Sequence, residues 1–433
     1  MKSTQFFLML FFCLVYYNLN AQLNIGKKLK NQTNNRANKE VNQEINKGLN
    51  SVESGVKDIF KKNKAPVAPQ PQPPNDTLSK GEFPQSPKDP SDTGTAIPLQ
   101  AYSKFDFIPG EKVIFFEDFS QDKVGDFPAL WNTNGSAEVV TTNLFPGNWM
   151  RFVTRDAIWS DDLLKLPDNY TIEFDVIPIQ GEEKRMAGYQ FRLMQATNIK
   201  AFDHGSAPGK GGFLFAVEYF GRPSFSTWFN QEGCPILALR GSKDDVVYKE
   251  KENQKYHIAL WAQKSRIRLY QDQNKLFDLP KAMPVECIKI DRIRFEEGAA
   301  MISNVRIAVG APDMRNKLIT DGKLVTYGIY FDVNKDEVKP ESYGTLKEIA
   351  AILNEVPDVN VNIVGHTDSD GDDIKNIDLS KRRAAAVKTE LARSFGVNGD
   401  RLVTDGLGES KPVAPNDSPV NKALNRRVEF IKL

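Results

Sequence analysis

Short segments in which apolar and polar residues alternate, between residues 102 and 312, constrain the fold of this chain more than any other feature. Gly, Pro and Asn separate segments such as YTIEFDVI, YQFRLMQ and GFLFAVEYF. Successive side chains of a strand point to opposite faces of a sheet, so the pattern is typical of strands that bury one face. Strands at this spacing predict an antiparallel sandwich or barrel.

Two stretches of residues 102–312 resemble a known family. The hairpin-like RIRLYQDQNKLFDLP and the closing ISNVRIA are similar to concanavalin A-like or laminin G-like jelly rolls. The resemblance implies an antiparallel β-sandwich of the jelly-roll type. An outer-membrane barrel stays open as an alternative, although irregular strand lengths and the lack of repeated aromatic girdles favour the sandwich.

The pattern changes again in residues 318–433, where expected strands and helices alternate. The strands are LVTYGIYF, VNVNIVGH, RLVTDGLG and RRVEFIKL, and the helices are PESYGTLKEIAAILNEV and LSKRRAAAVKTELARSF. This order, βαβαββ, predicts a compact α/β domain of ordinary size.

The first 101 residues differ in composition from both domains. Residues 1–21 place one Lys before an apolar run of roughly 12 residues, which is typical of a cleaved signal peptide and too short to span a membrane. Residues 22–62 carry one narrow apolar stripe, which predicts a disordered or partly helical arm; self-association or docking on a partner helix is the alternative. Residues 63–101 are Pro-rich and predict a linker.

Charge and cysteine content restrict the partners. The formal net charge of +1 gives no reason to expect nucleic acid or an anionic membrane as a partner. Cys13 lies inside the apolar run, which argues against lipid attachment. Cys234 and Cys287 are too few and too far apart for a zinc cluster or a redox CxxC pair. Two lone buried thiols are favoured over a disulfide.

One carboxylate and one guanidinium flank a helix entrance in the stretch GHTDSDGDDIKNIDLSKRRAAAV. Asp368 follows an expected strand, and Arg383 lies early in the next expected helix. Such a pair suits a zwitterionic ligand, since Asp accepts from an ammonium and Arg donates two hydrogen bonds to a carboxylate. The alternative is that the two side chains form a surface salt bridge worth ~0 to 1 kcal/mol.

Spaced motifs in this region resemble the OmpA-like peptidoglycan-binding domain. They are TDxxG, NxxLSxxRA and NRRV, carried by Thr367, Asp368, Gly371, Asn376, Leu379, Ser380, Arg383, Ala384, Asn425, Arg426, Arg427 and Val428. FDVNKDEVKPES and DGLGESKPVAPN extend the resemblance over nearly all of residues 324–433. The resemblance implies capture of the diaminopimelate side chain of peptide stems, with Asp368 on its ammonium and Arg383 on its carboxylate.

The same resemblance implies that four more residues complete the pocket by hydrogen bonding: Asn334, Thr367, Asn376 and Arg426. Structural roles compete with these assignments. Asn376 and Ser380 are also suited to capping the helix, and Arg426 to shielding a strand edge.

The run DSDGDD departs from the family pattern. Its extra carboxylates, Asp370, Asp372 and Asp373, either discourage a ligand carboxylate or form a solvated loop. A calcium loop of the EF-hand type is not supported, because its sixth and twelfth positions would hold Asp373 and Leu379 in place of Gly and Glu. We therefore predict no metal.

The sandwich lacks one of the three acidic residues that a glycoside hydrolase of this type needs. Glycoside hydrolases among the concanavalin-like jelly rolls carry three acids on one strand face, and EFDVIP offers only Glu173 and Asp175. Ile177 and Pro178 stand where the general acid should fall. The chain's three histidines lie in separate segments without ligand spacing. The sequence thus predicts no enzyme and no cofactor, and its tryptophans are expected in the core, with sugar stacking as the alternative.

These features together predict a non-catalytic envelope protein that binds peptidoglycan and tethers the sandwich to the wall. We expect export to the periplasm of a Gram-negative bacterium, with peripheral outer-membrane association and no transmembrane helix. A glycan or an envelope protein is a further candidate partner at the sandwich. The alternatives are a glycan-directed hydrolase or lectin, and an outer-membrane barrel protein with a periplasmic anchor.

Overall fold

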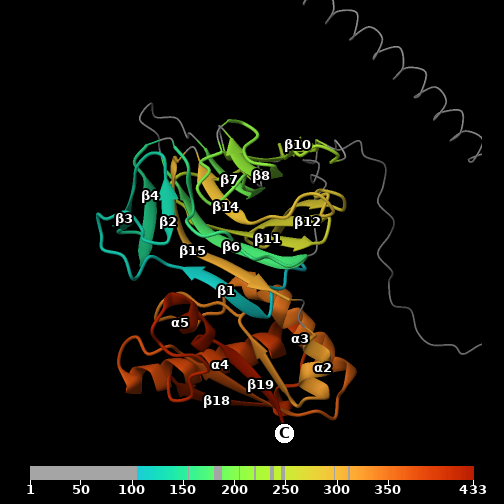
Figure 1. Ribbon diagram of the computed structural model, residues 1–433. Coiled ribbons are helices and arrows are strands. Elements are labelled where there is room, and N and C mark those ends of the chain that lie inside the picture. The colour runs from blue at the N-terminus through green and yellow to red at the C-terminus, as the bar shows by residue number, and fades with distance from the viewer. Residues whose placement is uncertain are drawn as a thin grey trace, which may run out of the picture. The chain divides into compact units, whose positions relative to one another are not determined.

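A computed structural model describes residues 105–154, 156–179, 188–203, 205–218, 221–234, 238–244, 249–296, 298–310 and 313–433. The predicted signal peptide (1–21), arm (22–62) and linker (63–101) lie outside the described residues. The rest of the chain forms a β-rich region followed by a mixed α/β region (Figure 1). Both regions belong to one compact unit.

The larger sheet of the β-rich region is built around the long strands β6 and β15. Its order is β13-β12-β11-β6-β15-β4-β3, and β1 also pairs with β15. The strands are β1 (Lys112–Glu117), β3 (Ala137–Thr141), β4 (Asn148–Phe152), β6 (Asn169–Pro178), β11 (Tyr256–Gln263), β12 (Arg266–Gln271), β13 (Asn274–Leu279) and β15 (Ala300–Val309).

A second sheet has the order β10-β9-β8-β7-β14-β5-β2. Its strands are β2 (Trp131–Thr133), β5 (Ile158–Ser160), β7 (Tyr189–Gln195), β8 (Gly211–Glu218), β9 (Arg222–Phe229), β10 (Arg240–Ser242) and β14 (Arg292–Glu296). Neighbouring strands run antiparallel in both sheets. The prediction of a two-sheet antiparallel sandwich is confirmed.

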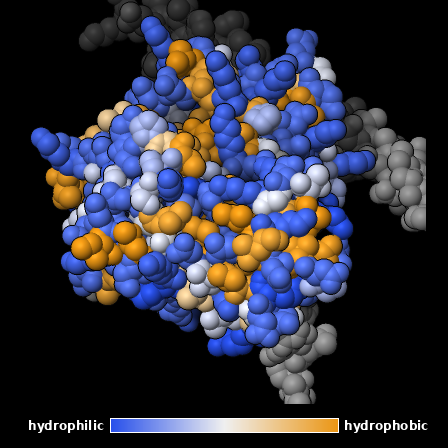
Figure 2. All heavy atoms as spheres, turned by 90° about the horizontal axis from the view of Figure 1, so that it is seen from below, coloured by the Kyte–Doolittle hydropathy of each residue, from blue (hydrophilic) through white to orange (hydrophobic). Residues whose placement is uncertain are grey.

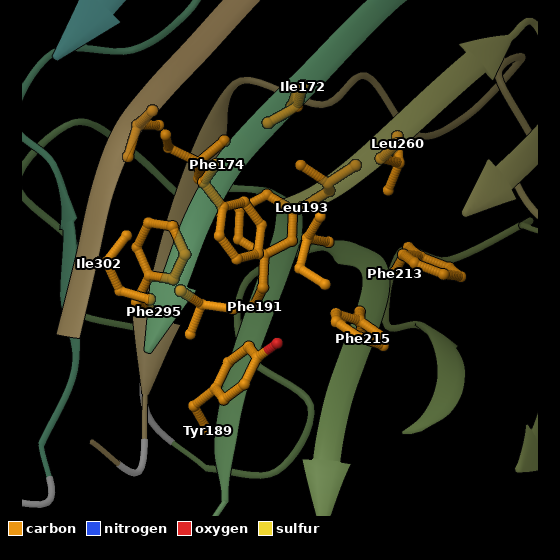
Figure 3. Packing of buried hydrophobic residues seen from close by; sticks show 14 of the residues in the cluster. Ile172, Phe174, Tyr189, Phe191, Leu193, Phe213, Phe215, Leu260, Phe295 and Ile302 are labelled. Carbon is orange, nitrogen blue, oxygen red and sulfur yellow. The ribbon is translucent and has the colours of Figure 1, made fainter. Parts of the chain in front are cut away.

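Apolar side chains from the two sheets meet in one core (Figure 3). Phe174 of β6 lies against Phe191 of β7 and Phe295 of β14, with ring centroids 4.9 and 5.1 Å apart. Alternation along β6 then turns Glu173 and Asp175 to the face opposite this core. That face of β6 is buried as well, because the α/β region covers it.

The α/β region contains a sheet of order β16-β19-β17-β18, in which β17 and β18 are parallel. Its strands are β16 (Lys323–Thr326), β17 (Val361–His366), β18 (Leu402–Gly408) and β19 (Val428–Lys432), and its helices are α2 (Met314–Ile319), α3 (Tyr343–Glu355), α4 (Asp373–Phe395) and α5 (Pro419–Asn425). The predicted βαβαββ order is confirmed, with the short α5 inserted before the last strand.

Strand β1 connects the two regions in space. Figure 1 shows it at the side of the sandwich that faces α5, and Val113 and Phe116 of β1 pack with Ala423 of α5. Apolar burial of this kind, roughly 25 cal/mol per Å², stabilises the contact. The sandwich therefore rests directly on the α/β domain.

Cys234 and Cys287 form a disulfide, with Cα atoms 5.8 Å apart. The prediction of two lone thiols is therefore wrong. The sequence separation of 53 residues concealed the contact, which the folded sandwich creates by bringing the segment after β9 to the segment after β13. Cα atoms this close suit a disulfide, and an oxidising compartment lets it persist.

The surface is mixed. Figure 2 shows apolar side chains in separate groups among hydrophilic ones on the face seen from below. Exposed large apolar residues of the α/β region include Ile374, Val403 and Val413. Scattered apolar exposure of this kind is ordinary for folded proteins. In the part of the chain that the structure describes, every helix is too short or too polar to cross a membrane.

Candidate functional site

A cavity of about 590 Å³ lies between the sandwich and the α/β region. The α/β region contributes all the residues that the sequence predicted for ligand binding: Asn334, Thr367, Asp368, Asn376, Arg383 and Arg426. The sandwich contributes residues from β1, β4, β6, β11 and β15. The structure therefore brings the predicted set together and adds a second wall.

Asp368 lies in the loop that follows β17, with its side chain 11% exposed. Its Oδ2 accepts a 2.6 Å hydrogen bond from Nη1 of Arg426, and its Oδ1 accepts from the amide of Asp370. The alternative salt bridge between Asp368 and Arg383 is not what the structure shows. Each carboxylate oxygen has two lone pairs, so Asp368 retains capacity for a ligand ammonium.

Arg383 projects from α4 toward the loop before η3 (Pro340–Ser342). Its Nε and Nη2 donate to the carbonyl oxygens of Lys335 and Asp332, at 2.9 and 3.1 Å, and its guanidinium lies 4.9 Å from the ring centroid of Phe331. Among the described residues Nη1 has no hydrogen-bond partner. The guanidinium is thus held in place with one nitrogen left for a ligand.

Burial lowers the pKa of Arg383 to about 10, while the charge of Asp368 acts in the opposite direction. A low-dielectric surrounding disfavours the charged form of any base. With a pKa near 10, Arg383 still carries its charge at neutral pH and can attract an anionic group.

Asn376 holds the loop that carries Asp368. Its Nδ2 donates to the carbonyl oxygens of Asp368 and Asp370, at 3.4 and 3.1 Å, and to a carboxylate oxygen of Glu409 at 2.7 Å. The alternative role as helix cap is filled by Asp372, whose side chain accepts from the amide of Lys375. Asn376 therefore positions the loop from inside the first turns of α4.

Ser380 does not cap α4, whose N-cap is Asp372. Its Oγ donates to the carbonyl of Ile377 and accepts from the amide of Gly408, which joins α4 to the end of β18. Thr367 is buried, and its Oγ1 has no hydrogen-bond partner within the described residues. An unpartnered buried hydroxyl beside a cavity is available to a ligand.

Asn334 and Arg426 both line the cavity. Asn334 is exposed and has a φ of 59°, a left-handed conformation that Asn tolerates. The guanidinium of Arg426 lies 4.9 Å from the ring centroid of Phe116 in β1. Arg426 thus links Asp368 to the sandwich, and does not shield a strand edge.

The extra carboxylates of the acidic run have structural partners. Asp370 pairs with Lys422 at 2.7 Å, and Asp372 caps α4. Asp373 lies in the first turn of α4, where the helix dipole favours a negative charge. Among the residues that the structure describes, no group of three or more acidic, His or Cys side chains is arranged to hold a metal ion.

The sandwich wall contains an ionic network that the sequence did not reveal. His257 lies between the two β6 carboxylates, with Nδ1 2.8 Å from Asp175 and Nε2 3.3 Å from Glu173. Nη1 of Arg306 donates to Glu173 at 2.7 Å, and the hydroxyl of Tyr330 donates to Glu173 at 2.6 Å. The sequence feature that could have indicated this network is the presence of charged residues in otherwise apolar strands.

The network keeps both carboxylates ionised. Burial alone would raise their pKa values, but His257 and, for Glu173, Arg306 hold the pKa of Glu173 and of Asp175 below the usual range. Burial by itself lowers the pKa of His257, yet its hydrogen bonds to the two carboxylates raise it to about 10. A general acid must hold a proton near neutral pH, so neither carboxyl suits that role.

The fold and the cavity define the C-terminal region as an α/β binding domain attached to a β-sandwich. Residues 330–426 match the OmpA family, and these residues form an OmpA-family domain.

Relatives share this domain. Outer membrane porin F of Pseudomonas aeruginosa is 43% identical over 105 residues, which cover 24% of this chain and 30% of that protein. The peptidoglycan-binding protein ArfA of Mycobacterium bovis is 42% identical over 92 residues, covering 21% of this chain and 28% of that protein. The chain thus spans less than a third of the length of these relatives.

The sandwich also has a structural likeness. A carbohydrate-binding module, CBM66 of Bacillus subtilis, aligns with a TM-score of 0.28 and 19% sequence identity. The alignment covers 42% of this chain and 96% of that module.

Proposed function

We propose that this chain is a non-catalytic cell-envelope protein that binds peptidoglycan through the diaminopimelate of peptide stems. The OmpA-family match over residues 330–426 and the relative described as peptidoglycan-binding support this function. The proposal includes export to the periplasm, association with the outer membrane and wall of a Gram-negative bacterium, and domains at 102–312 and 318–433. The sandwich is then held at the wall.

The arrangement of Asp368 and Arg383 carries the proposal. The free end of a diaminopimelate side chain bears an ammonium and a carboxylate on one carbon. Arg383 is fixed by two carbonyl oxygens and keeps Nη1 for the carboxylate, while Asp368 can accept from the ammonium. The unpartnered hydroxyl of Thr367 adds a third contact in the same cavity.

Co-sedimentation of the mature full-length chain with diaminopimelate-containing peptidoglycan tests the proposal. We expect Asp368→Asn and Arg383→Ala each to weaken binding about tenfold or more, the effect of losing a hydrogen bond to a charged group. Arg382→Ala is the matched control. Arg382 is the neighbouring residue on α4, but it is exposed, pairs with Asp336 and Asp378, and lies outside the cavity.

Peptidoglycan with lysine in place of diaminopimelate separates the two ligand groups. Lysine keeps the ammonium and lacks the carboxylate, so the wild type should bind this wall more weakly. Arg383→Ala should bind both walls equally, because it has lost the group that recognises the difference. Equal binding of both walls by the wild type, or full binding by Arg383→Ala, would contradict the proposal.

A glycan-directed hydrolase is the other class of function considered for the sandwich. Glu173 and Asp175 are ionised and engaged by His257 and Arg306, so they offer no proton to a leaving group. The proposed role of the sandwich is therefore binding without turnover.

A further inference from the structure

The sandwich forms a wall of the cavity that holds Asp368 and Arg383. Phe116, Leu144, Phe145 and Trp149 line its apolar part, and Arg306 lines its ionic part. These residues come from β1, from the loop before β4, from β4 and from β15. A ligand bound by Arg383 therefore enters a space that the sandwich also bounds.

Two buried donors of this wall lack acceptors. Trp149 is 2% exposed and Arg306 is 6% exposed. Within the described part of the chain, Nε1 of Trp149 and Nη2 of Arg306 have no hydrogen-bond partner. Both groups can only donate, and leaving a buried donor unpaired destabilises the fold. A ligand with carbonyl or carboxylate oxygens would relieve that destabilisation.

The size and charge of the cavity also suit a ligand larger than a single diaminopimelate side chain. Its volume of about 590 Å³ falls in the range that holds drug-sized ligands, ~300 to 1,000 Å³. Seven carboxylates and seven Lys or Arg side chains line it. A balanced lining of this kind favours a ligand that carries both signs of charge, as a short peptide with acidic and amino groups does.

Contacts hold the wall in place relative to Asp368. Nη1 of Arg306 donates to the hydroxyl of Tyr330 at 3.0 Å, which fixes β15 against the OmpA-family domain. Arg426 bonds to Asp368 and stacks on Phe116. The distance between the two walls is thus set by direct hydrogen bonds and packing.

We propose that the sandwich wall binds the peptide stem next to its diaminopimelate residue, with Trp149 Nε1 and Arg306 Nη2 donating to the carbonyl or carboxylate oxygens of the stem. This inference rests on the proposed function and deepens it. The OmpA-family side recognises the zwitterionic side chain, and the sandwich side recognises the peptide that bears it.

Calorimetric titration of the mature full-length chain tests the wall with two soluble probes, free diaminopimelate and a stem tetrapeptide containing it. Trp149→Phe keeps an aromatic side chain and removes the indole N–H. We expect it to weaken tetrapeptide binding about three- to tenfold, the effect of one hydrogen bond, and to leave the affinity for free diaminopimelate unchanged.

Trp131→Phe is the matched control, because Trp131 Nε1 is equally buried and unpartnered but lies in the sandwich core and outside the cavity. A second variant, Leu144→Asp, places a carboxylate on the wall at a side chain that is 59% exposed, so the fold tolerates it. It should weaken tetrapeptide binding selectively as well.

Selective loss of tetrapeptide affinity in the wall variants supports the inference. The inference is overturned if Trp149→Phe and Leu144→Asp both bind the tetrapeptide as tightly as the wild type does. The proposed function still stands in that case if Arg383→Ala loses affinity for both free diaminopimelate and the tetrapeptide. If Arg383→Ala binds both probes as the wild type does, the proposed function fails and this inference fails with it.

Discussion

The hydroxyl of Tyr330, in the OmpA-family domain, donates a 2.6 Å hydrogen bond to the buried carboxylate of Glu173 in the sandwich. Arg306 bonds to both groups, at 3.0 Å from the hydroxyl and 2.7 Å from the carboxylate. A buried charge is tolerated only when it is paired and hydrogen-bonded. Each domain therefore supplies hydrogen-bond partners to buried polar groups of the other.

Replacing Tyr330 tests that coupling. Tyr330→Phe removes a hydrogen bond to a charged group and should lower the free energy of unfolding by about 1.5 to 3 kcal/mol. Urea unfolding measures the change. Tyr256→Phe is the control, since the hydroxyl of Tyr256 bonds to exposed groups, and it should cost less than the first variant. Equal costs in the two variants would argue against a buried interdomain bond.

The pH dependence of stability should report His257. Its pKa is raised to about 10 in the folded chain, because hydrogen bonds to Asp175 and Glu173 outweigh burial. The stabilisation is then complete below about pH 6.5, the unfolded value, and is lost as the pH rises through about 10.

His257→Gln removes the charge, and breaking a buried ion pair costs about 3 to 5 kcal/mol. We expect the difference in unfolding free energy between wild type and His257→Gln to be largest near pH 6 and to shrink toward pH 10. Urea unfolding at several pH values measures it. A difference that stays constant over this range would show that His257 is not charged in the fold.

Replacing Glu250 should stabilise the fold, whereas replacing His257 should destabilise it. Burial raises its pKa to about 8, although a hydrogen bond from the hydroxyl of Tyr189 acts in the other direction. The stability that a raised carboxyl contributes is present below about pH 4.3 and is lost as the pH rises through about 8. Glu250→Gln stays neutral and keeps an acceptor for Tyr189.

We therefore expect Glu250→Gln to be more stable than the wild type by about 1 to 3 kcal/mol at pH 9, with the gap closing toward pH 4. Thermal unfolding across this range checks the sign. Glu286→Gln, at an exposed side chain, is the matched control for replacing a Glu by Gln. A wild type that is more stable than Glu250→Gln at pH 9 would contradict the assignment.

The disulfide should stabilise the sandwich without affecting the cavity. Replacing Cys234 and Cys287 together by Ala should lower the free energy of unfolding by about 2 to 4 kcal/mol, typical of a bridge that closes a loop of this size. Neither residue lines the cavity, so peptidoglycan binding should persist. Added reductant should destabilise the wild type and leave the double variant unchanged.

Asn376 should matter through the loop that it holds. Asn376→Ala removes three hydrogen bonds to the Asp368–Asp370 loop and Glu409, and we expect about tenfold weaker binding to diaminopimelate-containing peptidoglycan. Asn354→Ala, on α3 and bonded to an exposed carbonyl, is the control for co-sedimentation. Full binding by Asn376→Ala would show that the loop needs no such support.

Elements with strong periodicity were predictable, and short or polar ones were not. The alternation in YTIEFDVI predicted β6, and it also sets which side chains of β6 face the core between the two sheets. The strand β2 and the helix α5 are too short to show a period. Helix α4 begins at Asp373, earlier than the predicted LSKRR start, because its first turns are polar and only the cap at Asp372 marks the boundary.

The sequence by itself determined that Asp368 follows a strand and that Arg383 lies on the next helix, as its motifs predict. Only the tertiary structure decided their partners. Arg426 reaches Asp368 across 58 residues of chain, and Tyr330 reaches Glu173 across 157. The strand period fixes the face on which a side chain lies, whereas packing between distant segments selects the group that it meets there.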